Sequence, residues 1–401
     1  MRALVSVNLI FVSLNQILLS VGSALLVILF ARHLEQALFG ELRYIIAVLA
    51  VLAFCSLPGI GLIINRSASE LPAREIRDLI RQQLRWSVIA VVGALGFAVW
   101  HMMQGEPSIA RAFAVGGLVS TVPNLHSITG LICAGLGHFR RKILLDSFII
   151  VFAIFGTMFG VTWFSELYHI IGWYLGAQAG ATLIAFFIIR DLMFPAHETE
   201  TFPALTNHVR EGAQLTLIQV PFLLIPAVEK VLIYLLLGPV SLAIFVIAVL
   251  PIEHFKSAFR NLIQVYMLPY LNHPSTHSLI HWVSIGLLVL SGGALALAAF
   301  ILFGMPLLFP NYEAIRPFSL ALMLSLLPLP IHVIAVTWIA KRQLITLSRF
   351  AFFSTVCSLL LIALGAWWYG LWGAIVGKIL YEMVLAISLV RLDRPLERLP
   401  M

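Results

Sequence analysis

The sequence contains little charge for its length. Of its 401 residues, 11% are Asp, Glu, Lys or Arg, whereas 61% are hydrophobic and the mean hydropathy is +1.01. A soluble domain is about 25% charged and about 45–50% apolar. Because the apolar excess extends along the whole chain, the composition excludes an ordinary soluble enzyme and indicates a protein that crosses a membrane several times.

The chain also lacks the short motifs that mark many catalytic and metal sites. It has no Walker loop, HExxH or GxSxG, and no CxxC pair occurs among its cysteines, Cys55, Cys133 and Cys357. Three histidines recur at four-residue intervals from His273 to His281, but Pro274 weakens a helix there and no carboxylate joins them. We therefore expect no enzyme activity, no cofactor and no metal site, and assign the cysteines to packing.

Twelve stretches are long and apolar enough to span a bilayer, for which about 20 residues are needed. The predicted spans cover about residues 7–31, 40–64, 86–103, 110–134, 143–165, 167–189, 213–236, 239–268, 281–303, 314–339, 347–368 and 370–390. The first is longer than the apolar core of a signal peptide, so we interpret it as a retained span. The loops between spans are too short to contain a soluble domain.

The positive residues predict the orientation. With the N-terminus in the cytoplasm, most of the 25 Lys and Arg residues fall on the cytoplasmic side, as the positive-inside rule requires. An even number of spans then returns the C-terminus to the cytoplasm. The net charge of +7 therefore reflects membrane topology, and it does not indicate a nucleic-acid partner.

The middle of the chain is predicted to be a linker. Residues 191–212 include "HETETFPALTNH" and separate six spans from six, and "IIGWYLGAQAGATLIAFFIIR" (170–190) weakly parallels "LWGAIVGKILYEMVLAISLVR" (371–391). Parallel repeats are a transporter architecture, with substrate bound between the halves. We predict an all-α polytopic membrane protein with one six-helix bundle over 1–190, a cytoplasmic linker over 191–212 and a second six-helix bundle over 213–401.

Two adjacent charges interrupt the seventh span, in "PFLLIPAVEKVLIYLLLG". A charge at the centre of a bilayer costs about 2.5–3.5 kcal/mol or more, and neighbours on a helix do not face each other. Glu229 and Lys230 therefore each need a partner or water. Two interpretations stay open: an interhelical salt bridge, or a cavity-lining pair in which Lys230 attracts an anion and Glu229 carries a proton.

Other polar residues within spans are further candidates for a substrate or ion path. Lys378 and Glu382 are four apart and share a helix face, so they could pair with each other or line the path. Three further candidates lie in the eighth span: Glu253, His254 and Lys256. Asn8 and Asn15 share a face of the first span and could line a cavity or hydrogen-bond to another helix.

Four arginines recur on one side of a predicted cytoplasmic surface helix over residues 72–86: Arg74, Arg77, Arg81 and Arg85. Such a face would anchor the chain to anionic headgroups of membrane lipids. The alternative is a surface that collects a diphosphate lipid from the cytoplasmic leaflet.

The stretch "EKVLIYLLLGPVSLAIFVIAVLPIEHFKSAFRNLIQVYMLPYL" (229–271) resembles the bacterial O-antigen and polysaccharide flippases of the multidrug/oligosaccharidyl-lipid/polysaccharide exporter superfamily. The resemblance continues in "FGMPLLFPNYEAIRPFSLALMLSLLPLP" (303–330) and in the region around the second span. It covers most of the chain in order. The positions that carry it are Glu229, Lys230, Leu237, Gly238, Pro251, Glu253, Lys256, Phe309, Pro310, Tyr312, Phe39, Gly40 and Arg66.

This resemblance implies two six-helix bundles around a central cavity. It also implies a substrate, an oligosaccharide on undecaprenyl diphosphate, which moves from the cytoplasmic to the outer leaflet of the bacterial inner membrane by alternating access. A proton or sodium gradient would drive transport, with Glu229 or Glu382 as the carboxylate, and other polysaccharide-assembly membrane proteins would be partners.

Three alternatives remain, one of which is a non-transporting membrane subunit of an assembly. A multidrug/cation antiporter of the same superfamily would hold cations with acidic residues, whereas Lys230 and Lys378 favour an anionic substrate. A membrane-embedded glycan polymerase or ligase would need larger charged outer loops than this chain has.

Overall fold

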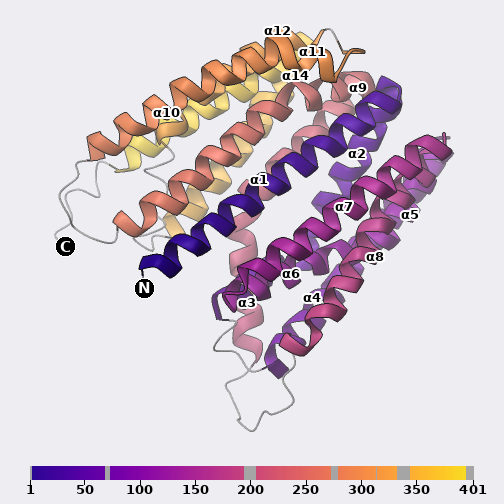
Figure 1. The fold of residues 1–401 in the computed structure, drawn as a ribbon. Helices are drawn as coiled ribbons and strands as arrows, with labels where there is room; N and C mark the ends of the chain where they lie inside the picture. Colours follow the sequence, from indigo (N-terminus) through magenta and orange to yellow (C-terminus); the bar gives the residue numbers. More distant parts are fainter. Residues whose placement is uncertain are drawn as a thin grey trace. The chain divides into compact units, whose positions relative to one another are not determined.

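The computed structural model describes residues 2–67, 73–193, 205–271, 279–312, 314–331 and 344–393 (Figure 1). These ranges form helices joined by short turns, and no strand occurs within them. The predicted all-α class is therefore confirmed for this part of the chain. Contacts divide the chain into two compact units, unit 1 (Met1–Val228) and unit 2 (Glu229–Met401).

The described residues of unit 1 form nine helical segments. They are α1 (Arg2–His33), α2 (Gln36–Ala53), α3 (Gly59–Ser67), α4 (Ala73–Met103), α5 (Pro107–Val119), α6 (Thr121–Gly135), α7 (Phe139–Trp163), α8 (Leu167–Met193) and the start of α9 (Leu205–Leu271), with a short 3₁₀ turn, η1 (Phe54–Ser56), after α2. The hydrophobic core of the unit lies where α3, α4, α6, α7 and α8 meet, and Cys133 is buried in it. The cysteines are free thiols.

Close packing within unit 1 depends on small residues. Gly156 of α7 lies against the Trp173 carbonyl and the Ala177 methyl group of α8, so a side chain there would push the two helices apart. The amide of Gly59 at the start of α3 donates a 2.9 Å hydrogen bond to Thr216 Oγ1 of α9. The first turns of α9 therefore pack on α3 and belong to this unit.

Two predicted boundaries in unit 1 were wrong. The predicted surface helix over 72–86 and the third span over 86–103 form one continuous helix, α4. Conversely, the second span, predicted over 40–64, is interrupted at Leu57, which has a φ of +56°. Leu57 precedes Pro58, and the proline ring disfavours the right-handed helical conformation in the residue before it. The helix therefore stops, and α3 begins after the turn.

Unit 2 contains the rest of α9 and the segments that follow. These are α10 (Leu279–Ala299), a π-helical turn η2 (Phe300–Gly304), α11 (Met305–Leu308), α12 (Ile315–Leu322), 3₁₀ turns η3 (Met323–Leu326) and η4 (Leu329–Ile331), and α14 (Leu344–Asp393). The two longest of these elements, α9 and α14, contain backbone conformations that are not helical.

The element α9 is a hairpin of two helices. Gly238 has φ +82° and ψ 177°, a conformation that is open essentially to glycine alone. Glu229 and Glu253 lie on either side of it, and both contact the same atom, Lys378 Nζ. In a straight helix their 24-residue separation would place them about 36 Å apart. The chain therefore reverses at Gly238, between the predicted seventh and eighth spans.

The element α14 reverses in the same way. Its helical conformation is broken at Tyr369 and Gly370, and Gly370 has a φ of +60°. Beyond the turn, Gly373 lies against the main chain of Gly365, and Gly377 of the same helix lies against the main chain of Leu361. The turn separates the predicted eleventh and twelfth spans. Exposed aromatic side chains surround it: Trp367, Trp368 and Tyr369.

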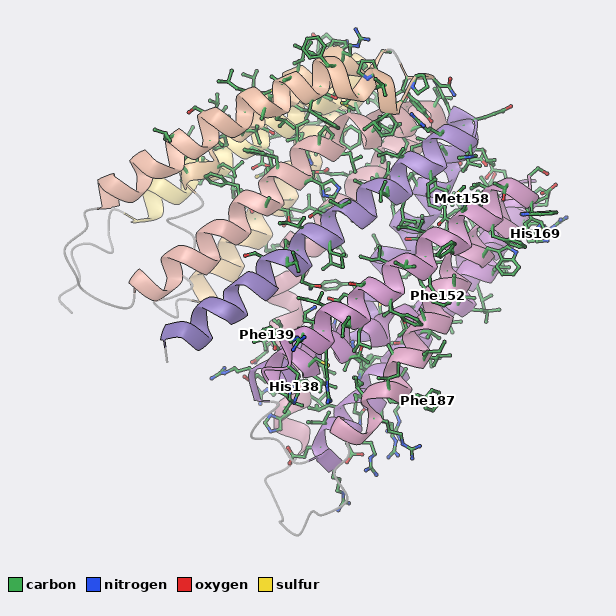
Figure 2. All side chains as sticks on the ribbon, in the orientation of Figure 1. His138, Phe139, Phe152, Met158, His169 and Phe187 are labelled. Carbon is green, nitrogen blue, oxygen red and sulfur yellow. The ribbon has the colours of Figure 1, made fainter. Side chains whose placement is uncertain are left out.

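The chain is a multi-pass membrane protein. By length and composition, eight helices among the described residues could cross a membrane, and two shorter apolar helices accompany them, residues 107–119 and 315–331. Large apolar side chains are exposed on α7 and α8, among them Phe152, Met158 and Phe187 (Figure 2), as expected of surfaces that face lipid. The count of twelve spans stays a prediction.

The predicted linker over 191–212 lies partly outside the described residues. Its described parts are helical: residues 191–193 end α8, and 205–212 form the first turns of α9. The division into two six-helix bundles at this linker stays a prediction.

Candidate functional site: a buried charge network in unit 2

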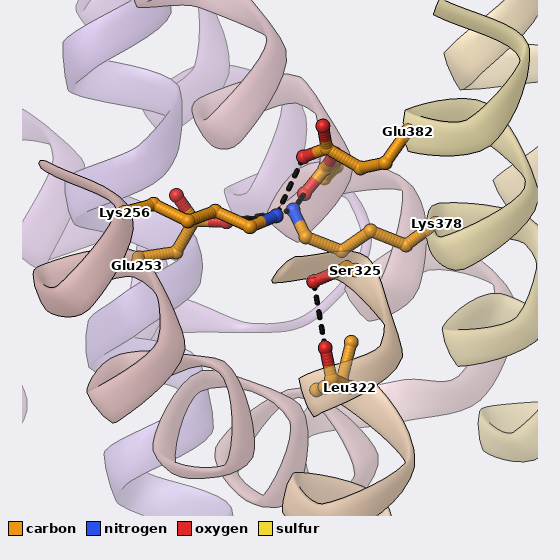
Figure 3. A network of polar contacts seen from close by, with 7 residues as sticks. Glu253, Lys256, Leu322, Ser325, Lys378 and Glu382 are labelled. Atoms are coloured by element: carbon orange, nitrogen blue, oxygen red, sulfur yellow. Dashed lines mark hydrogen bonds and ion pairs between the residues drawn. The ribbon is translucent and has the colours of Figure 1, made fainter. Parts of the chain in front are cut away.

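The hairpins α9 and α14 bring buried charges together in unit 2 (Figure 3). Lys378 Nζ of α14 donates a 2.7 Å hydrogen bond to Glu229 Oε2 of α9, and both side chains are buried. A second buried pair lies beside it, in which Lys256 Nζ of α9 donates a 2.6 Å bond to Glu382 Oε1 of α14. Each pair therefore joins the two hairpins.

Glu253 connects the two pairs. Its Oε1 atom lies 3.4 Å from Lys378 Nζ and 4.0 Å from Lys256 Nζ, so both ammonium groups approach one oxygen. The side chain of Glu253 is 33% exposed, whereas the other four are nearly or fully buried. Glu253 is therefore the most accessible member of the network.

The spacing along each helix explains the arrangement. Lys378 and Glu382 are four residues apart on α14 and face the same way, as predicted. They do not pair with each other, because each is bound to a residue of α9. Breaking one of these buried pairs would leave a charge uncompensated, which costs about 3–5 kcal/mol in proteins.

Glu229 and Lys230 differ in burial. Glu229 is buried and bonded to Lys378, whereas Lys230 is half-buried. Glu229 thus takes part in an interhelical ion pair, one of the two interpretations that the sequence left open. The roles of both residues in transport stay predictions.

Asn15, the candidate of the first span, lies in unit 1. Its Nδ2 donates a 2.8 Å hydrogen bond to Asp146 Oδ2, and Lys142 Nζ donates a 2.6 Å bond to the same oxygen. Asn15 thus hydrogen-bonds across helices, from α1 to α7. Asn8 lies on α1 too, but its side chain is outside the part that the structure describes.

The four predicted headgroup-binding arginines are exposed along the first turns of α4: Arg74, Arg77, Arg81 and Arg85. Asp78 lies 3.4 Å from Arg81 Nη1 on the same helix. The face is thus accessible to an anionic ligand.

The remaining polar residues include one that was not predicted and a histidine series that lies outside the described side chains. Lys256 was a candidate for the path together with Glu253, as a charge in the predicted eighth span, and it lies in the network. A buried histidine at the end of α4, His101, was missed. Within the described residues, no group of three or more His, Cys, Asp or Glu is placed to hold a metal ion. The side chains of the series His273–His281 are outside those residues.

No family model matches the chain, and no curated protein matches it. Solved structures do match. The chain is similar to the inward-facing conformation of a multidrug resistance MATE family transporter of the MOP superfamily, at 16% identity over 94% of each chain, with a TM-score of 0.64. The chain has the fold of the MOP-superfamily transporters.

Two further structures agree with this fold. A MOP-superfamily transporter from Pyrococcus furiosus, described as having a binding pocket of reverse polarity, matches at 15% identity over 96% of this chain and 94% of its own, with a TM-score of 0.64. The outward-facing conformation of a multidrug resistance MATE transporter matches at 15% identity over the same shares, with a TM-score of 0.56. The likeness therefore covers nearly the whole length.

Proposed function

We propose that the chain flips undecaprenyl-diphosphate-linked oligosaccharide, the repeat unit of an O-antigen or another polysaccharide, from the cytoplasmic to the outer leaflet of the bacterial inner membrane. Twelve spans in two six-helix bundles would alternate access to a central cavity, with both termini in the cytoplasm. The observation that carries the proposal is that two buried lysines, Lys256 and Lys378, approach one carboxylate oxygen of Glu253.

This arrangement suits a diphosphate. Without substrate, the carboxylates neutralise both ammonium groups, as buried charges require. A diphosphate carries several oxygens and about two negative charges, so it can replace the carboxylates as the partner of both lysines. The Oε1 atom of Glu253 then marks the position of one phosphate oxygen. The polyprenyl tail can stay in lipid while the polar headgroup crosses.

The charges of the network also suit a coupling cation. It contains three carboxylates and two lysines, so one added proton or sodium ion would neutralise it. Glu253 is the most exposed of the three carboxylates and has the longest contacts with the lysines, so an ion can reach it most easily. Uptake of a proton at these carboxylates would free the lysines for the diphosphate.

The exposed arginines of α4 and the half-buried Lys230 would act before this step. Four guanidinium groups on one face can hold a diphosphate headgroup at the cytoplasmic surface, together with anionic membrane lipids. Lys230 lies next to Glu229 and would draw the headgroup toward the network. After release, other membrane proteins of polysaccharide assembly would use the flipped product.

A second candidate function is a multidrug/cation antiporter. The excess of one carboxylate over the lysines and the exposure of Glu253 favour it, because an accessible carboxylate can bind a cationic compound. Two of the similar structures are multidrug resistance transporters. The two candidates differ in the charge of the substrate, which an experiment can separate.

The test uses purified protein in proteoliposomes with a polyprenyl-diphosphate oligosaccharide in one leaflet. A membrane-impermeant lectin measures its arrival in the other leaflet. We expect transfer by the wild type and loss of transfer in Glu229→Gln and Lys378→Met, with Lys230→Ala weaker than the wild type. The control is Glu211→Gln, which makes the same substitution on α9 at an exposed position near Arg66 and should keep transfer.

Size-exclusion profiles will show whether each variant is folded. Full transfer by folded Glu229→Gln and Lys378→Met would make the network purely structural. Absence of transfer by the wild type, together with proton-driven efflux of a cationic drug, would favour the antiporter.

A further inference from the structure

A groove lies between α7 and α8 on the surface of unit 1. It has a volume of about 450 Å³, and its lining is almost wholly apolar. Its floor consists of Gly156 and Ala177, which lie against each other where the two helices pack closely. Larger side chains of α7 form its sides: Phe152, Phe155 and Phe159. The surface is therefore concave here, because small residues lie between large ones.

Contacts between aromatic rings hold the sides of the groove in place. The ring of Phe159 packs edge-on against Trp173 of α8, with centroids 4.5 Å apart, and it stacks on Trp163 at 6.0 Å. The first contact joins the two helices across the groove. Because these rings are already ordered, a ligand would bind without a large loss of side-chain freedom.

The position of the groove indicates what fills it. Phe155 and Met158 are exposed, and Met158 follows Phe152 along α7 (Figure 2). In a multi-pass membrane protein, such side chains face hydrocarbon rather than water. The groove extends along α7 from Phe152 to Trp163, which is about 16 Å and therefore about half of a 30 Å hydrocarbon core. One acyl chain of a phospholipid spans that half.

Beyond Trp173, a row of rings leads from the groove to a positive charge. Centroids of successive rings are 6.4, 4.7 and 4.0 Å apart, from Trp173 through Phe164 and His169 to Tyr168. The guanidinium carbon of Arg111 on α5 lies 5.7 Å from the centre of the Tyr168 ring. Tyr168 precedes Trp173 by five residues, or about 7–8 Å along α8. That distance is comparable with the length of a glycerol phosphate.

The charges at this end match a zwitterionic headgroup. Arg111 is exposed, and so is Glu166, two residues before Tyr168. A guanidinium group binds a phosphate, and a carboxylate binds an ammonium group. A second negative charge on the lipid would instead be repelled by Glu166. Trp163, exposed at the same end, belongs to the residue types that concentrate at the headgroup level.

We infer that this groove is a binding site for one molecule of phosphatidylethanolamine. One acyl chain lies between α7 and α8, the phosphate lies beside Arg111, and the ammonium group lies beside Glu166. A lipid that binds the folded protein alone also stabilises it. The inference does not depend on the proposed substrate, whose charged network lies in unit 2.

Native mass spectrometry of the full-length protein, titrated with phosphatidylethanolamine in detergent, measures this binding. We expect one tightly bound lipid on the wild type and about tenfold weaker binding by Phe155→Ala, because part of the apolar contact is lost. Phe187→Ala is the matched control: Phe187, on α8 outside the groove, is 65% exposed and Phe155 is 69% exposed (Figure 2). Equal binding by these two variants would overturn the site, since it would show that the lipid covers the surface without preference.

Arg111→Gln tests the headgroup, and we expect it to weaken binding of phosphatidylethanolamine as well. Both surface variants should elute as the wild type does in size exclusion. Tighter binding of phosphatidylglycerol than of phosphatidylethanolamine would contradict the assigned headgroup.

Photocrosslinking in proteoliposomes locates the chain. A phosphatidylethanolamine with a diazirine in one acyl chain should label residues 152–163 of α7 and 173–177 of α8 most strongly. Uniform labelling of the exposed faces of α4, α7 and α8 would contradict a defined site. Loss of this labelling in the presence of an equal amount of a polyprenyl phosphate would assign the groove to a polyprenyl chain instead.

Discussion

Units 1 and 2 each contain an ion pair between a lysine and a buried carboxylate, but they build it differently. In unit 1, Lys142 and Asp146 are one turn apart on α7. In unit 2, Lys378 and Glu229 are 149 positions apart and join α14 to α9. The side chain of Lys142 is 25% exposed, whereas that of Lys378 is buried.

The ion pair of unit 1 depends on local sequence alone, whereas the ion pair of unit 2 depends on tertiary structure. The pair on α7 can form whenever that helix forms, because its partners are neighbours on one helix face. The pair between α9 and α14 forms only when both hairpins are folded and docked. The network of unit 2 is therefore sensitive to any movement between these elements, whereas the pair of unit 1 is not.

The largest effect is expected from Lys378→Met. It leaves Glu229 buried without its closest partner, so the free energy of unfolding should fall by about 3–5 kcal/mol. Lys142→Met should cost less, because Asp146 keeps its bond to Asn15. Denaturant unfolding of both variants in the same detergent measures the difference. Equal losses would show that the two pairs do not differ as described.

Gly373→Ala should have the next largest effect. A methyl group there would meet the main chain of Gly365, and because backbone cannot move aside easily, we expect a loss of about 3 kcal/mol. Gly292→Ala on α10 is the matched control, since no atom lies near its Cβ position. The two variants can be compared by thermal unfolding. Equal unfolding temperatures for the two variants would show that the two helices of α14 are not in close contact.

Gly238→Ala tests the turn of α9 alone. No neighbour lies near the Cβ position, so the cost arises from the backbone conformation and should be about 1–3 kcal/mol. Gly176→Ala, in the helical interior of α8 in unit 1, should instead be neutral or stabilising. Thermal unfolding of the pair measures the contrast, and a stabilised Gly238→Ala would be incompatible with a positive φ.

Asn15→Ala should have the smallest effect of the four. It removes one hydrogen bond between α1 and α7, and such bonds in membrane proteins average about 0.6 kcal/mol. Lys142 remains bonded to Asp146 in this variant, so the carboxylate stays neutralised. Unfolding in detergent measures the change. A loss as large as that of Lys378→Met would mean that unit 1 depends on its polar cluster as strongly as unit 2.

Much of the fold could be predicted from local pattern. The turns at Gly238 and at Tyr369–Gly370 coincide with predicted span boundaries, because apolar runs of membrane length end there. The continuity of α4 could also have been predicted, since residues 73–92 contain no glycine or proline. Pro58 likewise indicated the break after α2. The apolar run around it is long enough to suggest one uninterrupted span, so the break was not predicted.

The partners of the buried charges could not be predicted in this way. The spacing of Lys378 and Glu382 predicted that both lie on one helix face. That spacing is compatible with a pair between the two residues and also with a separate partner for each on another helix. Which one forms depends on the docking of α9, which no local pattern encodes. His101 was missed for the same reason, because its partners come from other elements.

The turn of α14 has a consequence for depth in the bilayer. Aromatic residues with polar edges settle at the headgroup level, and three of them are exposed at this turn, Trp367, Trp368 and Tyr369. Lys378 follows Gly370 by eight residues, and Glu229 precedes Gly238 by nine. At 1.5 Å per residue, each charge lies about 12–14 Å from its turn.

A hydrocarbon core is about 30 Å thick, so a turn of α14 held at its edge places Lys378, and with it the paired Glu229, near the midplane. Membrane thickness then becomes a variable that acts on the pair. A thicker bilayer would draw the headgroup-anchored turn of α14 outward and carry Lys378 with it, whereas the turn of α9 has no such aromatic anchor at Gly238. The length of the lipid chains would thereby set how far the Lys378 ammonium group and the Glu229 carboxylate are displaced from each other along the membrane normal.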